Sequence, residues 1–382
     1  MKKIAKLTWL HNGNFGSVLQ AAALQRYLLE QGYDVIDLDY NASLSEKLKN
    51  WIRNRNSPKL FLGKFEEAKR KKNYKNPEEF VKRGEKFSEF EEKWIKRGQL
   101  CHTPVEIKEE SKKYDIFICG SDQIWSPALM NPIFYLDFVQ KGKKKIAYAP
   151  SFGVTSTTTA KEKKITEYLK TFSNISVRES QGQQFIKKLI GKNVPVVIDP
   201  TLLLSTSIWN EYAIAPEIEE DYILCYLLTP NSKYLQAVSK FAKEKGLDVV
   251  IVPTTKGPFD TGFKEIIGIG PAEWLGLIQN SKYVFTDSFH GCIFSSLFHK
   301  EFILFKRFKD ENKASENSRI YTLAKMLDVE ERIIDESNLN AIGKLKMIDF
   351  EKVDAIIEGK AKESKDWLLN ALKEVGDRKS VV

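Results

Sequence analysis

The sequence has few cysteines and histidines, and it lacks the spacings that usually accompany metal sites. Its four cysteines form no CxxC pair, and no two of the four histidines stand at a metal-ligand spacing. We therefore expect no structural zinc, and we expect the thiols to be buried in a reducing cytoplasm. No apolar run reaches the roughly 18 residues that a spanning helix needs. The first residues have an apolar run broken by Lys6, which is typical of a first strand and not of a signal peptide.

Signals for two common classes of ligand are also missing. The loop at 11–17, HNGNFGS, holds two glycines but not the GxGxxG pattern, so it is a poor dinucleotide fingerprint and a fair site for a sugar or an anion. No nucleic-acid recognition module accompanies the basic residues. We expect no nucleic-acid partner, no metal and no nucleotide cofactor.

Positive charge is concentrated in one segment. Residues 46–100 hold 17 lysines or arginines against 9 acidic residues, a net of +8, while the whole chain carries +9. The apolar spacing there is helical, which predicts a basic helical insertion at 42–100 that includes the run Lys69-Arg70-Lys71-Lys72. Such a surface is either a solvated helical face or a docking surface for anionic lipid or a polyanionic glycan.

Elsewhere the chain alternates strands and helices, which predicts parallel sheets covered on both faces. At 382 residues, two domains are the natural expectation. We predict two doubly wound, Rossmann-like α/β domains facing a cleft, at 1–205 and 206–382, with the last helix bracing the first domain. Strands are expected at 4–10, 35–39, 116–119, 145–149, 175–178, 194–198, 222–227, 249–252, 283–286 and 302–305. Helices are expected at 18–30, 160–172, 179–190, 233–245, 272–279, 289–299 and 350–374.

The most informative stretch is 283–299, YVFTDSFHGCIFSSLFH. A strand ends at Thr286, Ser288 can cap a new helix, and His290 falls in its first turn. A helix start above a sheet offers free N–H groups and a positive dipole end, where anions bind. His290 is therefore a candidate catalytic residue, and the alternative is a histidine that only satisfies a neighbouring carbonyl group.

Other polar residues follow the predicted strands, where ligands bind in such sheets. The loop after the third strand, CGSDQIW, offers a carboxylate, an amide and an aromatic ring, and Asp122 is there either a base for a sugar hydroxyl or a plain turn residue. A cationic cluster suits a small polyanion. The candidates for binding a sugar are Asn12, Asn14, Gln123 and Trp125. The candidates for holding an anion are Arg178, Ser288, Phe289, Arg307 and Arg319.

Seven pieces of the sequence follow one another along the chain: NGNFGSVLQAAALQ, CGSDQIW, IAYAPSFG, SVRES, VIDPTLLL, TDSFHGCIFSSLFHKEFI and NSRI. In their order and spacing they together resemble the polysaccharide pyruvyl transferase family. The resemblance implies a glycosyltransferase-B-like fold and transfer from phosphoenolpyruvate to a sugar of a polysaccharide or its precursor, as a pyruvate ketal. It implies donor-site roles for His290 and Arg178. The arginine of the family's arginine-any-histidine motif is replaced by Ser288, so either the donor differs or Arg307 or Arg319 supplies the charge.

The residues fit that chemistry, with His290 as general acid or phosphate contact and Asp122 as base toward the acceptor. Two alternatives remain open. One is a nucleotide-sugar glycosyltransferase, for which Asp287 and Glu273 are the candidates for holding a ribose. The other is a non-catalytic glycan-binding member of the family. We expect an enzyme of the cytoplasm whose acceptor is lipid-linked or polymeric, and whose basic segment contacts the anionic inner face of the membrane.

Overall fold

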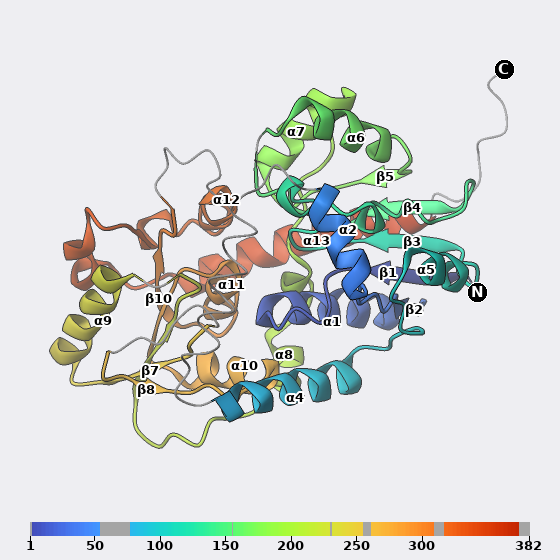
Figure 1. The fold of residues 1–382 in the computed structure, drawn as a ribbon. Helices are drawn as coiled ribbons and strands as arrows, with labels where there is room; N and C mark the ends of the chain where they lie inside the picture. The colour runs from blue at the N-terminus through green and yellow to red at the C-terminus, as the bar shows by residue number, and fades with distance from the viewer. Residues whose placement is uncertain are drawn as a thin grey trace. The chain divides into compact units, whose positions relative to one another are not determined.

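The computed structural model describes residues 2–53, 77–154, 156–229, 231–254, 261–308 and 317–373 (Figure 1). Contacts between residues divide this part of the chain into two compact units. Unit 1 contains residues 2–53, 94–204 and 358–373, and unit 2 contains residues 77–93 and 205–357. Each unit is built around its own parallel sheet, and each is described here by itself.

Unit 1 is organised by a five-stranded sheet in the order β2-β1-β3-β4-β5, with every neighbouring pair parallel. The strands are nearly continuous apolar runs because helices cover both faces. Buried charges interrupt the apolar pattern at a few places, and Lys6 of β1 forms an ion pair with Asp37 at the end of β2. The strands are β1 (Lys3–Leu7), β2 (Asp34–Asp37), β3 (Ile116–Cys119), β4 (Lys144–Ala147) and β5 (Asn174–Ile175). The helices are α1 (Phe15–Glu30), α2 (Leu44–Arg53), α5 (Pro104–Ser111), α6 (Thr159–Leu169) and α7 (Ser180–Ile190).

The last helix, α13 (Phe350–Lys373), contributes its residues 358–373 to unit 1. There the Ser364 hydroxyl accepts a hydrogen bond from the Ile198 N–H at 3.1 Å, and Leu368 is fully buried. The amino group of Lys365 lies 5.6 Å from the centre of the Tyr27 ring on α1. These contacts make the helix part of the core of unit 1 and not an exposed appendage.

Unit 2 is organised by a six-stranded parallel sheet in the order β11-β10-β9-β6-β7-β8. Figure 1 shows α9 on one face of this sheet and α10 and α11 on the other. The strands are β6 (Tyr222–Tyr226), β7 (Asp248–Ile251), β8 (Lys264–Glu265), β9 (Tyr283–Thr286), β10 (Glu301–Phe305) and β11 (Ile333–Ile334). The helices are α4 (Pro77–Trp94), α8 (Thr206–Tyr212), α9 (Ser232–Lys245), α10 (Pro271–Asn280), α11 (Phe289–Leu297) and α12 (Asn317–Leu327).

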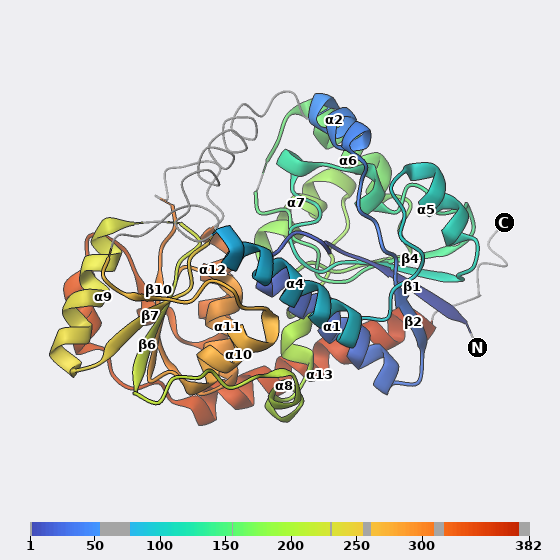
Figure 2. The ribbon, with the colours of Figure 1, turned by 60° about the horizontal axis from the view of Figure 1, so that its bottom comes forward.

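Part of the basic segment is structural in unit 2. Figure 2 labels α4 in the ribbon. Arg83 of this helix is buried, and its guanidinium donates to the carbonyls of Pro253 and Ile267 at 2.8 and 2.6 Å. The amino group of Lys86 lies 3.2 Å from the Glu273 carboxylate. Residues 77–93 therefore pack with unit 2 and not with the first domain, where the sequence predicts them. The run Lys69-Arg70-Lys71-Lys72 lies outside the described residues.

The predicted fold class is confirmed, since both sheets are parallel and their strands alternate with helices along the chain. The strands predicted at 116–119 and 283–286 match β3 and β9, and most other boundaries differ by one to three residues. The strand predicted at 194–198 is wrong: only Val196 pairs, as a single bridge to Val177. Pro195 interrupts this segment, and a proline cannot donate to a sheet ladder. No helix in the described ranges is both long and apolar enough to cross a membrane.

Candidate functional site

Asp287 joins three strand ends in unit 2. It follows β9 directly, and its two carboxylate oxygens accept hydrogen bonds from the Leu228 and Thr229 N–H groups at 2.6 and 3.0 Å. These two residues follow β6, the neighbouring strand. Arg307, which follows β10, places its Nε 3.7 Å from the same carboxylate and donates to the Thr229 hydroxyl at 3.2 Å. The carboxyl ends of β6, β9 and β10 are thereby held as one polar platform.

Burial is the main influence on the acidity of Asp287. It raises the pKa of Asp287 to about 6, and the charge of Arg307 and the two backbone N–H donors act in the opposite direction. The carboxylate is therefore charged above about pH 6, and its charge-assisted hydrogen bonds are at full strength there. From the sequence, Asp287 is predicted only as a candidate for holding a ribose.

α11 begins directly after Asp287, at this polar platform. The Ser288 hydroxyl accepts a hydrogen bond from the Gly291 N–H at 3.2 Å, which confirms that Ser288 caps the helix. A side chain at Gly291 would meet the Thr286 hydroxyl at 2.5 Å, so glycine allows α11 to approach β9 closely. His290 is the second residue of the helix, is 7% exposed, and lies edge-on to the Phe289 ring at 5.3 Å. The histidine thus sits at the positive end of a helix dipole.

Cationic residues flank the same strand ends. Arg307 follows β10, and Arg319 lies in the first turn of α12. Asn317 fixes the start of α12 to the segment after β10, because its amide donates to the Phe308 carbonyl at 2.7 Å and its Oδ1 accepts from the Phe308 N–H at 3.3 Å. Unit 2 therefore carries all of the anion-binding candidates except Arg178: Ser288, Phe289, Arg307 and Arg319.

A second cluster lies at the carboxyl ends of the strands in unit 1. Asp122 follows β3 and accepts from the Ser17 hydroxyl, at the start of α1, at 2.5 Å. Its other oxygen lies 3.4 Å from the Arg178 guanidinium, which also donates to Asp199 at 2.7 Å. Asp199 in turn accepts from the N–H and the hydroxyl of Thr201. The loop is tightly built, since a side chain at Gly120 would meet the Tyr148 carbonyl at 2.0 Å.

The structure places Arg178, which the sequence predicts as a donor-binding residue, in the interior of unit 1. The Arg178 side chain is only 2% exposed, and its charge is already matched by Asp199 and Asp122. Burial disfavours the charged form, but these two carboxylates and that of Glu179 outweigh it and raise the pKa of Arg178 above its usual value. Arg178 is permanently charged and holds three segments of unit 1 together.

Trp125 also lies in the interior of unit 1. Predicted to face a sugar, it is fully buried, stacks on Tyr135 at 5.2 Å, and packs against Phe152 and Phe172. Its indole N–H donates to the Phe134 carbonyl at 3.0 Å. A large aromatic ring that follows a strand can either pack in a core or stack on a ligand, and the local sequence does not distinguish these two roles.

The remaining sugar-binding candidates lie in loops of unit 1. Asn12 and Asn14 are exposed in the loop after β1, and Asn14 caps α1 by accepting from the Ser17 N–H at 3.1 Å. Gln123 follows Asp122, and its side-chain nitrogen is buried and makes no hydrogen bond within the part of the chain that the structure describes. The Ser17–Asp122 bond joins the two loops. The sequence predicts that these residues follow strands, and in the structure they follow β1 and β3.

The family model for polysaccharide pyruvyl transferases matches residues 14–307, more than half of the chain. The chain belongs to this family. It is accordingly a transferase, as the ordered motifs predicted. No curated protein matches the sequence.

Solved structures resemble this pyruvyl transferase family member in fold. UDP-N-acetylglucosamine 2-epimerase from Rickettsia bellii has a TM-score of 0.51 at 9% identity, covering 98% of this chain and 97% of that one. A glycosyltransferase from Rickettsia africae has a TM-score of 0.51 at 12% identity, covering 97% and 94%. HepE from Anabaena, in complex with UDP and glucose, has a TM-score of 0.51 at 8% identity, covering 98% and 100%. At these identities the likeness concerns the glycosyltransferase-B-like fold alone.

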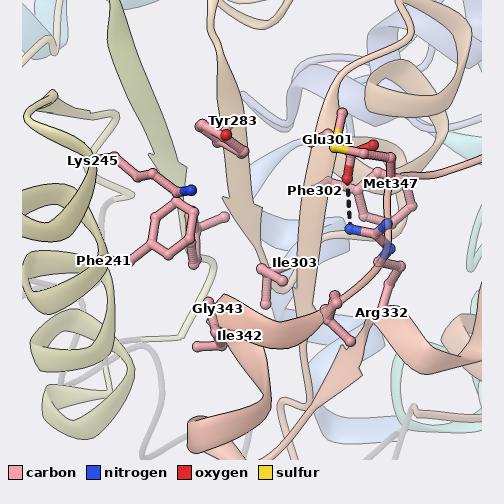
Figure 3. Close-up of a pocket in the computed structure, with 12 residues that line it drawn as sticks. Phe241, Lys245, Tyr283, Glu301, Phe302, Ile303, Arg332, Ile342, Gly343 and Met347 are labelled. Carbon is pink, nitrogen blue, oxygen red and sulfur yellow. Dashed lines mark hydrogen bonds and ion pairs between the residues drawn. The ribbon is translucent and has the colours of Figure 1, made fainter.

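The family member also has a small cavity of about 90 Å³ in unit 2 (Figure 3). It lies at the amino ends of β9 and β10, because Tyr283 and Glu301 are the first residues of those strands. Glu301 is paired there with Arg332 at 2.7 Å, and the rest of the lining is mainly apolar. Asp287, Ser288 and His290 lie at the opposite ends of the strands, so this cavity is separate from the candidate site.

Proposed function

We propose that this protein transfers a pyruvyl group from phosphoenolpyruvate to a sugar of a cell-surface polysaccharide or its precursor, forming a pyruvate ketal. The observation that carries the proposal is the family match over residues 14–307. The polar platform of unit 2 supports it, because His290 lies in the first turn of α11, which begins directly after Asp287, and Asp287 pairs with Arg307 from the end of the neighbouring strand β10. That combination suits a small molecule with both a carboxylate and a phosphate.

The reaction has two bond-forming steps. A sugar hydroxyl attacks C2 of the enol ester while C3 takes up a proton, and a second hydroxyl then attacks C2 as phosphate leaves. The first step needs a proton donor toward C3, and His290 is the proposed general acid. No metal or nucleotide is required by this scheme, and phosphoenolpyruvate enters as donor substrate.

The donor's negative charges need cations at the carboxyl ends of the strands. We assign this role to Arg307 and Arg319 of unit 2, which replace the motif arginine that is missing at Ser288. The Ser288 hydroxyl is engaged as the helix cap, so its contribution is to fix the start of α11 under the donor. Arg178 acts indirectly, by holding Asp122 and Asp199 in unit 1.

Ligand-dependent thermal stability tests the donor. Phosphoenolpyruvate, UDP-glucose, UDP, inorganic phosphate and pyruvate are each added to the purified protein, and the unfolding midpoint is measured. A ligand at about 100 times its dissociation constant stabilises the folded state by about 2.7 kcal/mol. We expect a raised midpoint with phosphoenolpyruvate, a smaller rise with phosphate or pyruvate alone, and none with UDP-glucose.

The same panel separates the alternatives. Stabilisation by UDP-glucose but not by phosphoenolpyruvate would establish a nucleotide-sugar glycosyltransferase, which the fold also accommodates. Stabilisation by neither would favour a non-catalytic glycan-binding member, consistent with the absent motif arginine. Phosphate release in the presence of a sugar acceptor, followed by mass spectrometry of the product, then identifies the ketal.

We further propose that the protein works at the cytoplasmic face of the membrane and touches it through α2. Leu44, Leu48 and Ile52 recur every fourth residue along one face of this helix and are 85%, 56% and 47% exposed. An exposed apolar face with basic neighbours suits the surface of an anionic bilayer. The basic neighbours on the helix are Lys47, Lys49 and Arg53.

Sedimentation with vesicles tests this contact. The triple substitution Leu44→Ser, Leu48→Ser and Ile52→Ser should abolish sedimentation with phosphatidylserine-containing vesicles at low salt. Reversing the charges of Lys69, Arg70, Lys71 and Lys72 should weaken it too, by about 1 kcal/mol per charge brought near the surface. Val105→Ser, at an equally exposed position on α5, is the matched control. A wild-type protein that stays in the supernatant at low ionic strength rules the contact out.

A further inference from the structure

The cavity of about 90 Å³ in unit 2 lies at the amino ends of β9 and β10, away from the polar platform (Figure 3). Residues of α9, of the two strands and of the segment 332–347 line it. Among them Lys245 and Met347 are exposed, whereas Phe302 and Arg332 are buried. The cavity therefore leads from an open rim into the interior of the unit.

The charges at the inner end of the cavity are matched within the fold. Arg332 donates to one oxygen of Glu301 at 2.7 Å and to the Lys346 carbonyl, and its Nε lies 3.6 Å from the Glu331 carboxylate (Figure 3). The other oxygen of Glu301 accepts from the Ile348 N–H at 2.7 Å. A buried ion pair whose charges are matched in this way has no net charge to offer a ligand.

The rim differs, because its polar groups are not used by the described residues. Lys245 forms no ion pair within the described ranges, and its amino group lies 5.6 Å from the centre of the Phe241 ring. The Tyr283 ring lies edge-on to the same ring at 5.1 Å, and in the described part of the chain its hydroxyl has no hydrogen-bond partner. A lysine ammonium is a donor with no acceptor, so the group that suits this rim is an anion.

The interior of the cavity suits a short hydrocarbon chain. One water needs about 10–15 Å³ of such a volume, so 90 Å³ holds about six to nine groups of that size. A methylene group is similar in size to a water, and a chain of about four to six carbons therefore fills the space. The apolar lining consists of Phe241, Phe285, Phe302, Ile303, Ile342 and Leu345.

We propose that unit 2 binds a short-chain aliphatic carboxylate in this cavity, with the hydrocarbon chain inside and the carboxylate at the Lys245 ammonium. Burial of the chain supplies most of the affinity, roughly fourfold for each methylene group. Lys245 supplies the selection for an anion over a cation of the same length. The site lies at the opposite strand ends from Asp287 and His290, so it is additional to the donor site and does not depend on the reaction that the protein catalyses.

Titration of the purified full chain with hexanoate, followed by ligand-observed NMR, tests the site. We expect saturable binding with a dissociation constant of roughly 1 mM or lower, within the range open to so small a ligand. Butanoate, two methylene groups shorter, should bind more than about tenfold more weakly. Hexylamine should not bind, and inorganic phosphate, which suits the polar platform, should not displace hexanoate.

A matched pair of lysine variants locates the carboxylate. Lys245→Met keeps an unbranched apolar side chain and removes the charge, and it should weaken hexanoate binding by about tenfold or more. Lys243→Met, at an exposed position in the last turn of the same helix and outside the lining, should bind hexanoate as the wild type does. Both positions are exposed, so neither substitution disturbs the core.

Filling the interior locates the chain. Ile342→Phe places a larger side chain in the lining, and the folded variant should lose hexanoate binding. Absence of saturable hexanoate binding to the wild type, equal binding of hexylamine, or displacement by phosphate overturns the proposal. Equal weakening by the two lysine variants, or unchanged binding to a folded Ile342→Phe, overturns it as well.

Discussion

Replacing His290 by glutamine is expected to reduce turnover by about 100-fold or more while the protein remains folded. Glutamine is a good helix former and can keep a hydrogen bond in the first turn of α11, but it cannot donate a proton to carbon near neutral pH. The side chain has little exposed surface, so the substitution tests the chemistry with little change to the molecular surface. Steady-state phosphate release in the presence of phosphoenolpyruvate and acceptor measures the effect.

The matched control for this experiment is His299→Gln. His299 follows α11, contacts the Asp354 carboxylate at 2.9 Å, and is about half exposed. Its substitution should leave turnover unchanged and the unfolding midpoint nearly so. If His290→Gln retains wild-type turnover, His290 takes no part in the mechanism, and its role is limited to the start of the helix.

Replacing Arg178 by methionine is expected to cost about 3–5 kcal/mol of folding free energy, because it leaves buried carboxylates without their counter-ion. Asp122 and Asp199 are the groups affected, at 3.4 and 2.7 Å from the guanidinium. Acid neutralises stranded carboxylates, so the loss of stability should shrink as the pH is lowered. Urea unfolding of the two proteins at several pH values measures both effects.

Arg26→Met is the control for Arg178→Met. Arg26 pairs with Glu30 one turn along α1, with both side chains about one third exposed. Such exposed pairs contribute about 0.2–1 kcal/mol, so the control should stay close to wild type. Adding Asp122→Asn to Arg178→Met should recover part of the loss, since one stranded charge is removed. Equal stability of Arg178→Met and wild type would contradict the structural role assigned to this arginine.

The architecture was predictable because hydrophobic periodicity is a local property. β3 and β9 are each a run of four residues that are apolar or β-branched, and no proline interrupts either run. The segment 194–198 is equally apolar, yet Pro195 removes a donor and only Val196 pairs. β5, at 174–175, is shorter than predicted: after it only Val177 pairs, as a single bridge to Val196, and Arg178 donates to Asp199. In both cases tertiary contacts and proline chemistry, which periodicity does not report, set the boundary.

The candidate site was only partly predictable, because its contacts join residues far apart in the chain. The place of His290 in a first helical turn follows from Ser288 and the strand before it. In contrast, the pairing of Arg178 with Asp122 and Asp199 spans 56 and 21 positions. The 2.5 Å contact of His11 with Asp39 likewise joins the segments after β1 and β2, which are neighbours in the sheet. Composition and spacing identified residues that could carry charge, and the fold decided which of those charges neutralise one another.

The division of the chain has a consequence for its synthesis. Unit 1 takes its first strand from residues 3–7 and its last helical segment from residues 358–373. The bond from Ile198 to Ser364 and the burial of Leu368 cannot form until residues up to 368 have left the ribosome. Domains that are continuous in sequence fold one after another as they emerge. Here the earlier unit has to wait for the later one, and a chain stopped before residue 358 would expose the apolar surface that α13 covers.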